Sequence, residues 1–302
     1  MGIEKGRPRR GITFYSYHNL MGRCMTLEDC FEEAYDTGAT CFELLTSYID
    51  NYPNPSSEWI DKYWGLCEKY NLRPSELGHW AENHLRRGPA MTDEEVVEEL
   101  KTDFKLAHML GFTSLRTKIT CTNFMCDPEP GWQSYIEKAL PWAEKYDVMM
   151  QNEVHLPTTL HTPHIRDEYL DFIKRTGTSH FGFNIDFGTF QFKQPEGFGP
   201  IVMSDYKDIT KPEEIVDFLP YSRSCHTKFV NINENFEEET IPYREVIQLM
   251  IDNGWSGDLL SEYEGPIRFF AEESFENFGK AMEIIPDQVR RHQIMMKNIL
   301  GY

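Results

Sequence analysis

The stretch Met149-Met150-Gln151-Asn152-Glu153-Val154-His155, near the middle of the chain, predicts a short strand that ends in an acid and a histidine. It continues directly into Leu156-Pro157, and because proline cannot donate a hydrogen bond to a sheet, we expect the strand to end there. Glu153 and His155 are two positions apart, which places both side chains on the same face of an extended chain. The carboxyl end of this strand is therefore a candidate site of chemistry.

Similar strand-like runs lie before and after residues 149–155, and a helical pattern separates each run from the next. The predicted strands are 11–18, 38–45, 75–80, 113–119, 148–155, 181–188, 225–230 and 258–264. The predicted helices are 26–35, 57–70, 92–110, 132–146, 165–175, 211–219, 243–253 and 268–300. Eight strand-then-helix units without a break in composition predict a single-domain α/β protein over residues 1–302, a (β/α)8 TIM barrel. A doubly wound open sheet is the alternative, but it needs an early Gly-rich phosphate turn, which the sequence lacks.

The composition excludes several classes of protein. Asp and Glu number 49 against 30 Lys and Arg, a formal net charge of -19, so we expect neither nucleic acid nor an anionic membrane as partner. The seven cysteines include no Cys-x-x-Cys pair, and the N-terminus lacks an apolar signal core. These features predict a cytoplasmic protein with reduced thiols.

Three later predicted strands also end in a potential metal ligand, namely Asp186, His226 and Glu262. With Glu153 they lie on four consecutive strands, and the carboxyl ends of barrel strands converge on the active site. One such acid alone is more often solvated or salt-bridged, but four in succession favour a metal site. Three carboxylates and one imidazole suit Mn²⁺ or Mg²⁺ and can accept Zn²⁺, Co²⁺ or Fe²⁺.

Four short motifs strengthen this interpretation: Asn-Glu-Val-His at 152–155, Asn-Ile-Asp-Phe-Gly at 184–188, Cys-His-Thr-Lys at 225–228 and Ser-Glu-Tyr-Glu-Gly at 261–265. Through them the chain resembles the xylose-isomerase-like TIM-barrel family of sugar isomerases and epimerases over nearly its whole length. The resemblance implies that Glu153, Asp186, His226 and Glu262 bind a divalent metal, and that the two glutamates also transfer protons. One position departs from the epimerases, which usually have a histidine where this chain has Thr189.

Within that family, the Tyr-Ser-Tyr-His opening at 15–18 adds a resemblance to the α subunits of C-glycoside deglycosidases. This implies a Mn²⁺-dependent lyase that cleaves the sugar–aryl carbon–carbon bond of a 3-oxo-C-glycoside. It also implies a small β subunit as partner, in a higher oligomer. Two alternatives stay open: a sugar isomerase or 3-epimerase on a free or phosphorylated ketose, and, more remotely, a phosphodiesterase like the DNA-repair endonuclease that shares this barrel.

His155 is a candidate general base, because it shares a face with Glu153 and its unperturbed pKa is close to neutrality. A histidine at the rim of the site is an equally good interpretation. Glu153 and Glu262 are the other candidates for proton transfer. Five further residues are candidates for substrate binding: His79, Trp80, Tyr17, Glu43 and Lys228. Against this, a tryptophan at such a place is usually core, and a lysine near a strand end is usually solvated.

A Phe-, Gly- and Pro-rich loop at about 187–205 interrupts the regular pattern. Its four phenylalanines are Phe187, Phe190, Phe192 and Phe198. We expect them to cover the substrate, to pack on the barrel rim or to meet another subunit.

Overall fold

A computed structural model describes residues 5–79, 91–117, 129–156, 158–193 and 210–302. In it eight parallel strands close into a barrel in which each strand pairs with its neighbours in the sequence and β8 pairs with β1. The strands are β1 (Arg9–Thr13), β2 (Cys41–Leu45), β3 (Arg73–His79), β4 (Ser114–Thr117), β5 (Met149–Val154), β6 (Phe181–Asp186), β7 (Ser224–Phe229) and β8 (Asp258–Tyr263). The predicted TIM barrel is confirmed.

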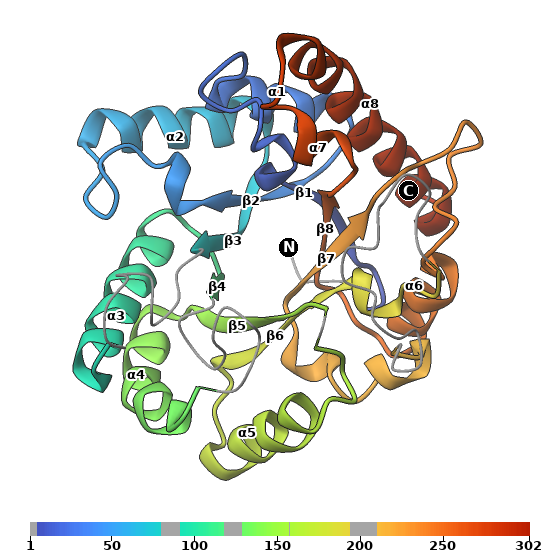
Figure 1. Cartoon of the computed structure of the whole chain (residues 1–302). Helices are drawn as coiled ribbons and strands as arrows, with labels where there is room; N and C mark the ends of the chain where they lie inside the picture. Colours follow the sequence, from blue (N-terminus) through green and yellow to red (C-terminus); the bar gives the residue numbers. More distant parts are fainter. Residues whose placement is uncertain (1–4, 80–90, 118–128, 157, 194–209) are drawn as a thin grey trace.

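Helices form a ring around this barrel (Figure 1). The α-helices are α1 (Leu27–Asp36), α2 (Ser57–Tyr70), α3 (Asp93–Met109), α4 (Trp132–Tyr146), α5 (Leu170–Thr176), α6 (Tyr243–Asp252), α7 (Ile267–Phe270) and α8 (Phe275–Leu300). Thr26 and Thr92 begin α1 and α3 with capping boxes, in which the threonine hydroxyl and a carboxylate three residues later satisfy the first backbone N–H groups. Helix α2 ends at Asn71, which adopts the left-handed conformation.

Several predicted elements differ from the structure, among them the predicted helix 268–300, which is divided into α7 and α8. The first strand ends at Thr13, and Phe14–Tyr17 forms a 3-10 turn capped by the Thr13 hydroxyl. The predicted helix 211–219 is instead a 3-10 turn at Pro212–Ile215, followed by another at Leu219–Tyr221. Pro212 lies in the first turn of this segment, a position at which helices tolerate proline, and Pro220 lies beyond the predicted helix, so the prolines do not account for the difference. The predicted helix 165–175 begins as a π-helical segment, His164–Tyr169, that precedes α5.

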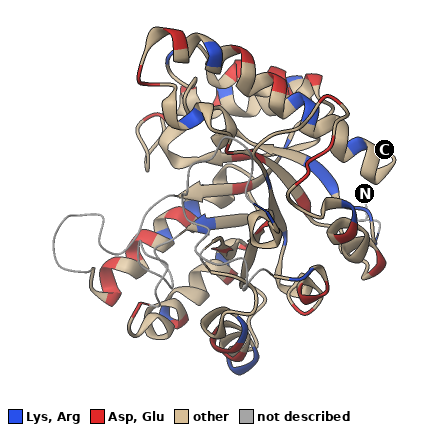
Figure 2. Ribbon diagram, turned by 45° about the vertical axis from the view of Figure 1, so that its right-hand side comes forward, with Lys and Arg blue, Asp and Glu red and all other residues tan. Residues whose placement is uncertain are grey.

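The barrel interior holds charged and polar side chains, whereas apolar ones fill the space between strands and helices. Among the described residues, Glu43, Glu76, Arg116, Gln151 and His226 are almost completely buried, as is an apolar set that includes Phe42 and Phe183. Figure 2 shows acidic and basic residues both on the outer helices and on the strands. Charged groups buried in the barrel interior need partners within the protein, because they are removed from water. The candidate site lies among these groups.

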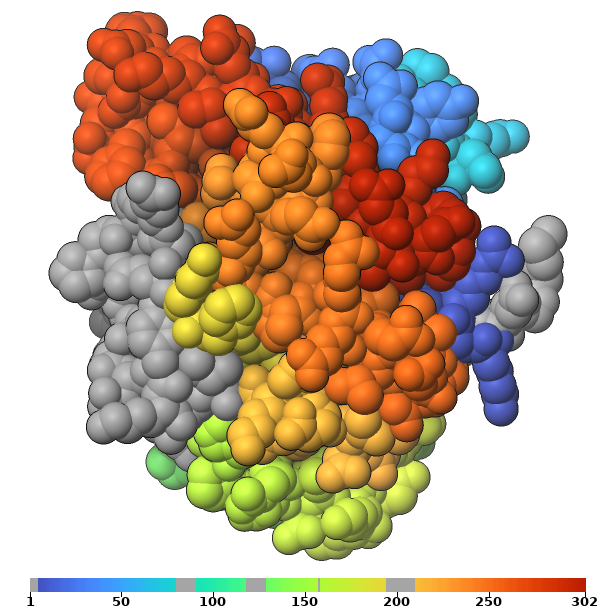
Figure 3. All heavy atoms as spheres, turned by 90° about the vertical axis from the view of Figure 1, so that its right-hand side faces the viewer, coloured from blue at the N-terminus to red at the C-terminus, as the bar shows by residue number. Residues whose placement is uncertain are grey.

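The two ends of the chain lie against each other on one side of the barrel (Figure 3). The Tyr302 hydroxyl donates to the carbonyl of Pro8 at 2.7 Å, and the Arg7 guanidinium lies 4.5 Å from the centre of the Tyr302 ring. Among the described residues, no helix is long and apolar enough to cross a bilayer.

Candidate metal centre

The carboxyl ends of β5, β6, β7 and β8 bring together the four residues that the sequence singled out. Glu153, Asp186, His226 and Glu262 each offer one donor atom, and these atoms lie within 4.8 Å of one another. Asp186 and His226 are direct partners in the pairing of β6 with β7. Glu153 is instead paired with Asn184 and Glu262 with Lys228, and His226 is the third of six residues in β7, so the four side chains converge from different positions along their strands.

Contacts within this cluster are close and incompletely satisfied. His226 Nδ1 lies 3.1 Å from Glu153 Oε1 and 3.2 Å from Glu262 Oε1. Asp186 Oδ1 accepts the Gly188 backbone N–H at 2.6 Å. Its Oδ2 is buried and has no hydrogen-bond partner among the described residues. An orphaned buried carboxylate oxygen beside two other acids fits a cation, because such an atom is costly to leave unpaired.

Burial and mutual repulsion shape the charges of the cluster. The pKa of Asp186 is raised well above its ordinary value by burial and by Glu262 and Glu153, although Lys228 opposes the shift. Burial alone would lower the pKa of His226, but Glu262 and Glu43 outweigh it and raise that pKa well above its usual range. A divalent cation bound here would relieve this repulsion directly.

Arg116, on β4, supplies a buried positive charge beside the cluster. Its guanidinium donates from Nε to Glu43 Oε1 at 2.8 Å and from Nη1 to Glu153 Oε2 at 3.1 Å. Burial opposes ionisation of both acids, but Arg116 and His226 overcome it: the pKa of Glu43 falls to about 2, and that of Glu153 falls well below its ordinary value. Arg116 therefore keeps two carboxylates ionised in the barrel interior.

A second group of potential ligands shares His226. Donor atoms of Glu43, Glu76 and His226 also lie within 4.8 Å of one another. Arg116 already pairs with Glu43, however, and burial together with Glu43 raises the pKa of Glu76 to about 7. Gln151 Nε2 also donates to Glu76 Oε1 at 2.8 Å. This group fits a cation less well than the first.

Lys228 and His155 lie close together near the candidate ligands. Lys228 Nζ pairs with Glu264 and lies 3.2 Å from His155 Nε2, while His155 Nδ1 lies 2.5 Å from the Leu156 carbonyl. Burial would lower the pKa of Lys228, but Glu264 and Asp186 raise it above its ordinary value. The lysine is therefore charged, so His155 Nε2 accepts a hydrogen bond from it and His155 Nδ1 donates one to the Leu156 carbonyl.

His79 is the last residue of β3, and its side chain contacts helix α3. Its Nδ1 lies 2.5 Å from Asp103 Oδ2 on α3, and the Tyr52 hydroxyl donates to Asp103 Oδ1 at 2.6 Å. It also lines a cavity of about 370 Å³ beside Tyr52. Trp80, the predicted neighbour in substrate binding, lies outside the described residues.

Two other residues predicted to bind substrate, Glu43 and Tyr17, are buried. Glu43 is fully buried against Arg116 and His226. Tyr17 is fully buried among core residues, so its ring offers no accessible surface to a ligand. In the predicted loop, Phe187 and Phe190 are buried and contact each other, while Phe192 is 50% exposed. Phe198 lies outside the described residues.

Sequence reasoning missed four residues that shape this site: Arg116, Glu76, Glu264 and Asp103. Arg116 and Glu76 carried one available signal, because each is a charged residue inside a predicted strand. Glu264 carried another, since its position two residues after Glu262 matches the period of a strand. Asp103 lies within a helix rich in acids, and nothing in its local sequence separates it from solvated neighbours.

Solved structures with the same architecture include sugar epimerases. An L-ribulose 3-epimerase superposes with a TM-score of 0.68 and 14% identity, covering 97% of this chain and 95% of its own. A D-allulose 3-epimerase from Methylomonas sp. gives a TM-score of 0.65 and 12% identity, covering 99% of this chain and 100% of its own. At these identities the likeness shows the shared fold.

Curated sequences add a second comparison. A C-glycoside deglycosidase alpha subunit of Arthrobacter globiformis is 24% identical, over 86% of this chain and 85% of its own. A 3'-dehydrocarminate deglycosidase alpha subunit of Microbacterium sp is 22% identical, over 85% of this chain and 88% of its own. The family model described as "Xylose isomerase-like TIM barrel" matches residues 31–288. The chain therefore belongs to the xylose isomerase-like TIM barrel family.

Proposed function

We propose that this chain is the α subunit of a divalent-metal-dependent C-glycoside deglycosidase, a lyase that cleaves the sugar–aryl carbon–carbon bond of a 3-oxo-C-glycoside. The observation that carries the proposal is the convergence of Glu153, Asp186, His226 and Glu262, with Asp186 Oδ2 left without a hydrogen-bond partner in the described part of the chain. The names of the curated relatives support the choice of reaction.

The four residues would hold the cation, with Mn²⁺ as the first choice and Mg²⁺, Co²⁺ or Zn²⁺ as alternatives. Such a cation, when bound, polarises a sugar carbonyl and acidifies the neighbouring C–H. Arg116 would keep Glu153 ionised for this role. Lys228, which is charged and close to His155, would stabilise negative charge that develops on the carbonyl oxygen.

His155 is our choice for the base, with Glu153 and Glu262 as alternatives. Its Nε2 accepts from Lys228 and would have to exchange that contact for the C2 proton of the sugar. The electron pair of the C2–H bond would move toward the C3 carbonyl. It would then return to form a C1–C2 double bond as the C1–aryl bond breaks, and the aryl carbon would take up a proton. The products are an unsaturated 3-oxo sugar and the free aglycone.

A ketose isomerase or 3-epimerase is the alternative, because it begins with the same proton abstraction. Glu153 and Glu262 favour it, since the resemblance to the epimerases implies that these two glutamates transfer protons and both lie beside His226 in the cluster. Thr189 weakens it, because the resemblance to the epimerases predicts a histidine there. An endonuclease-like activity fits poorly with a net charge of -19.

One incubation separates the two reactions. The chain is supplied with Mn²⁺ and either a 3-oxo-C-glucoside or a panel of free and phosphorylated ketoses, with and without a candidate small β subunit. Release of free aglycone supports the lyase. Interconversion of ketoses without aglycone release would assign the chain to the isomerases and epimerases.

Two variants test the metal centre. Asp186→Asn and His226→Ala should lose bound metal in elemental analysis and lose activity, because each removes a donor from the cluster. Asp171→Asn is the matched control, since its side chain is 78% exposed on α5. Full activity in a metal-free preparation of the unmodified chain would refute the proposed role of the cation.

A further inference from the structure

A large cavity lies at the end of the barrel opposite to the candidate metal centre. Its volume is about 770 Å³, within the range typical of small-molecule sites. Arg9, Arg73 and Asp258 line it at or near the amino-terminal ends of their strands, and Arg223 directly precedes β7. Neither the proposed reaction nor the family comparison assigns a role to this cavity.

Positive charge predominates in the lining, on a chain that is strongly acidic as a whole. Three arginines, at 9, 73 and 223, face two aspartates, at 147 and 258. Arg9 Nε donates to Asp258 Oδ1 at 2.7 Å, and Arg73 pairs with the other oxygen of the same carboxylate. Two of the arginines therefore share one acid, and the cavity carries an excess of positive charge.

Of the three arginines in this lining, Arg223 is the one that forms no ion pair with a described carboxylate. Within the described part of the chain, its side chain makes one hydrogen bond, from Nη1 to the Thr113 carbonyl at 2.8 Å. Asp147 lies nearby, but its carboxylate contacts His180 Nε2 at 3.1 Å. A guanidinium offers five donors, and burial lowers the pKa of Arg223. An anion that paired with it would use the remaining donors and offset the cost of burial.

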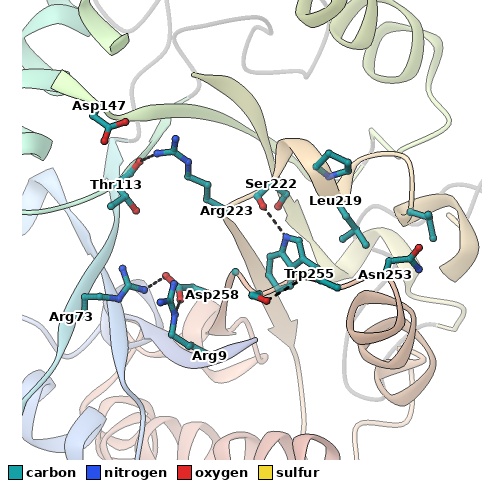
Figure 4. A pocket seen from close by; sticks show the side chains of 15 residues that line it. Arg9, Arg73, Thr113, Asp147, Leu219, Ser222, Arg223, Asn253, Trp255 and Asp258 are labelled. Carbon is teal, nitrogen blue, oxygen red and sulfur yellow. Dashed lines mark hydrogen bonds and ion pairs between the residues drawn. The ribbon is translucent and has the colours of Figure 1, made fainter. Parts of the chain in front are cut away.

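The other side of the cavity is apolar and fixed in position. Val216, Leu219, Pro220 and Trp255 line it, and the Trp255 indole Nε1 donates to the Ser222 carbonyl at 2.8 Å. In Figure 4, Arg223 extends toward Thr113 and Asp147, Arg9 and Arg73 meet at Asp258, and Trp255 and Leu219 lie on another side. The cavity therefore offers a charged pole and a flat apolar surface.

We propose that this cavity binds a small organic anion, with a carboxylate or phosphate group paired to Arg223 and an apolar body lying against Trp255 and Leu219. A guanidinium group binds a carboxylate and a phosphate in the same way, through two parallel hydrogen bonds, so either group could pair with Arg223. The proposal does not depend on the reaction at the metal centre, and it is tested by binding alone.

Calorimetry on the full chain, with bound metal removed so that no anion binds there, tests the proposal. The probes are phenyl phosphate, benzoate, inorganic phosphate and the neutral benzyl alcohol. We expect saturable binding of phenyl phosphate or benzoate, weaker binding of inorganic phosphate and none of benzyl alcohol. A preference between phenyl phosphate and benzoate would identify the oxyanion. Equal binding of benzyl alcohol, or no binding of either aryl anion at low salt, would overturn the proposal without bearing on the lyase.

Variants of Arg223 locate the binding. Arg223→Gln should lower the affinity for the aryl anion by about tenfold or more, because a charge-assisted hydrogen-bonded pair is lost. Arg223→Lys keeps the charge without the planar fork and should be intermediate, so it remains informative if the glutamine variant folds poorly. Arg175→Gln is the matched control, since Arg175 pairs with Glu137 on the surface. Equal losses in Arg223→Gln and Arg175→Gln would place the anion elsewhere and refute the assignment.

Discussion

Arg116 is the residue on which the electrostatics of the barrel interior depend. Its side chain is only 2% exposed, yet it carries a full charge and contacts both Glu43 and Glu153. A buried ion pair is weak evidence for stability, but removal of one partner leaves an uncompensated buried charge. Without Arg116, the carboxylates of Glu43 and Glu153 would both be buried without this positive partner.

We therefore predict that Arg116→Met lowers the free energy of unfolding by about 3–5 kcal/mol. Denaturant titration followed by circular dichroism measures the change. Arg175→Met is the control: its ion pair with Glu137 is exposed, so it should leave the unfolding curve unchanged. An Arg116→Met protein as stable as the unmodified chain would show that Glu43 and Glu153 find other partners.

His292 gives the molecule a defined sensitivity to acid. It is fully buried, stacks on Phe229 with ring centres 4.1 Å apart and contacts Ser261 and Tyr243, and burial lowers its pKa to about 3. In the unfolded chain a histidine has a pKa of about 6.5. Below that pH the unfolded state binds a proton that the folded state does not, so stability falls as the pH falls from about 6.5 toward 3.

His292→Gln should consequently flatten the pH dependence of the unfolding free energy between about pH 6.5 and pH 4, where one such group contributes up to ~1.4 kcal/mol per pH unit. Thermal and denaturant unfolding at several pH values measure this slope. His108→Gln, at an exposed position on α3, is the control and should keep the slope of the unmodified chain. An unchanged slope in His292→Gln would mean that His292 is charged in the folded state.

At the residue scale, the four candidate ligands were predictable because they lie on four consecutive predicted strands, although His226 is the third residue of its strand and not at the strand's end. Arg116 and Glu76 were not singled out, because their importance depends on which way a strand faces and on partners that are 37 or more residues away in the sequence. Tyr17 was placed incorrectly: the chain turns into a 3-10 segment after Thr13, and the tyrosine enters the core.

At the scale of elements, strong local signals were reliable. Capping threonines marked the starts of α1 and α3 correctly, whereas the residues after Lys211 suggested a helix where the structure has 3-10 turns at Pro212–Ile215 and Leu219–Tyr221. Gly182, inside β6, shows a constraint that sequence cannot reveal. A Cβ atom there would lie 1.9 Å from the Tyr221 carbonyl oxygen, so the strand and the turn after Phe218 touch backbone to backbone.

We predict that Gly182→Ala lowers the free energy of unfolding by about 1–3 kcal/mol or more, because a backbone neighbour cannot move aside as a flexible side chain can. Gly279→Ala is the matched comparison, since Gly279 lies within α8 and a Cβ there would meet nothing within 4 Å. That variant should be more stable by about 0.5–1 kcal/mol, as alanine favours helix. Equal effects of the two substitutions in denaturant unfolding would contradict this account.

At the scale of the whole molecule, the chain is acidic overall and also gathers carboxylates in the barrel interior. The chain has a net charge of -19, and the candidate metal centre places three carboxylates around one imidazole in the barrel. A cation that binds this cluster in the folded state alone stabilises the fold by mass action. Mn²⁺ should therefore raise the melting temperature of dialysed protein, and Asp186→Asn should abolish that rise while Asp171→Asn preserves it. A Mn²⁺ shift of equal size in Asp186→Asn would place the bound cation elsewhere.

The last prediction concerns assembly. The curated relatives are named alpha subunits, and we propose that this chain likewise requires a small β subunit. Of the three described phenylalanines in the loop, Phe187 and Phe190 pack internally and Phe192 is half exposed, so two of these three side chains are taken up by packing within the chain. We expect native mass spectrometry to detect a complex when the chain is co-expressed with a candidate β subunit. We also expect that complex to release aglycone, whereas the chain alone should not. The control is co-expression with a β subunit that does not bind the chain, which measures any effect of co-expression alone. A stable, active monomer would exclude an obligate partner.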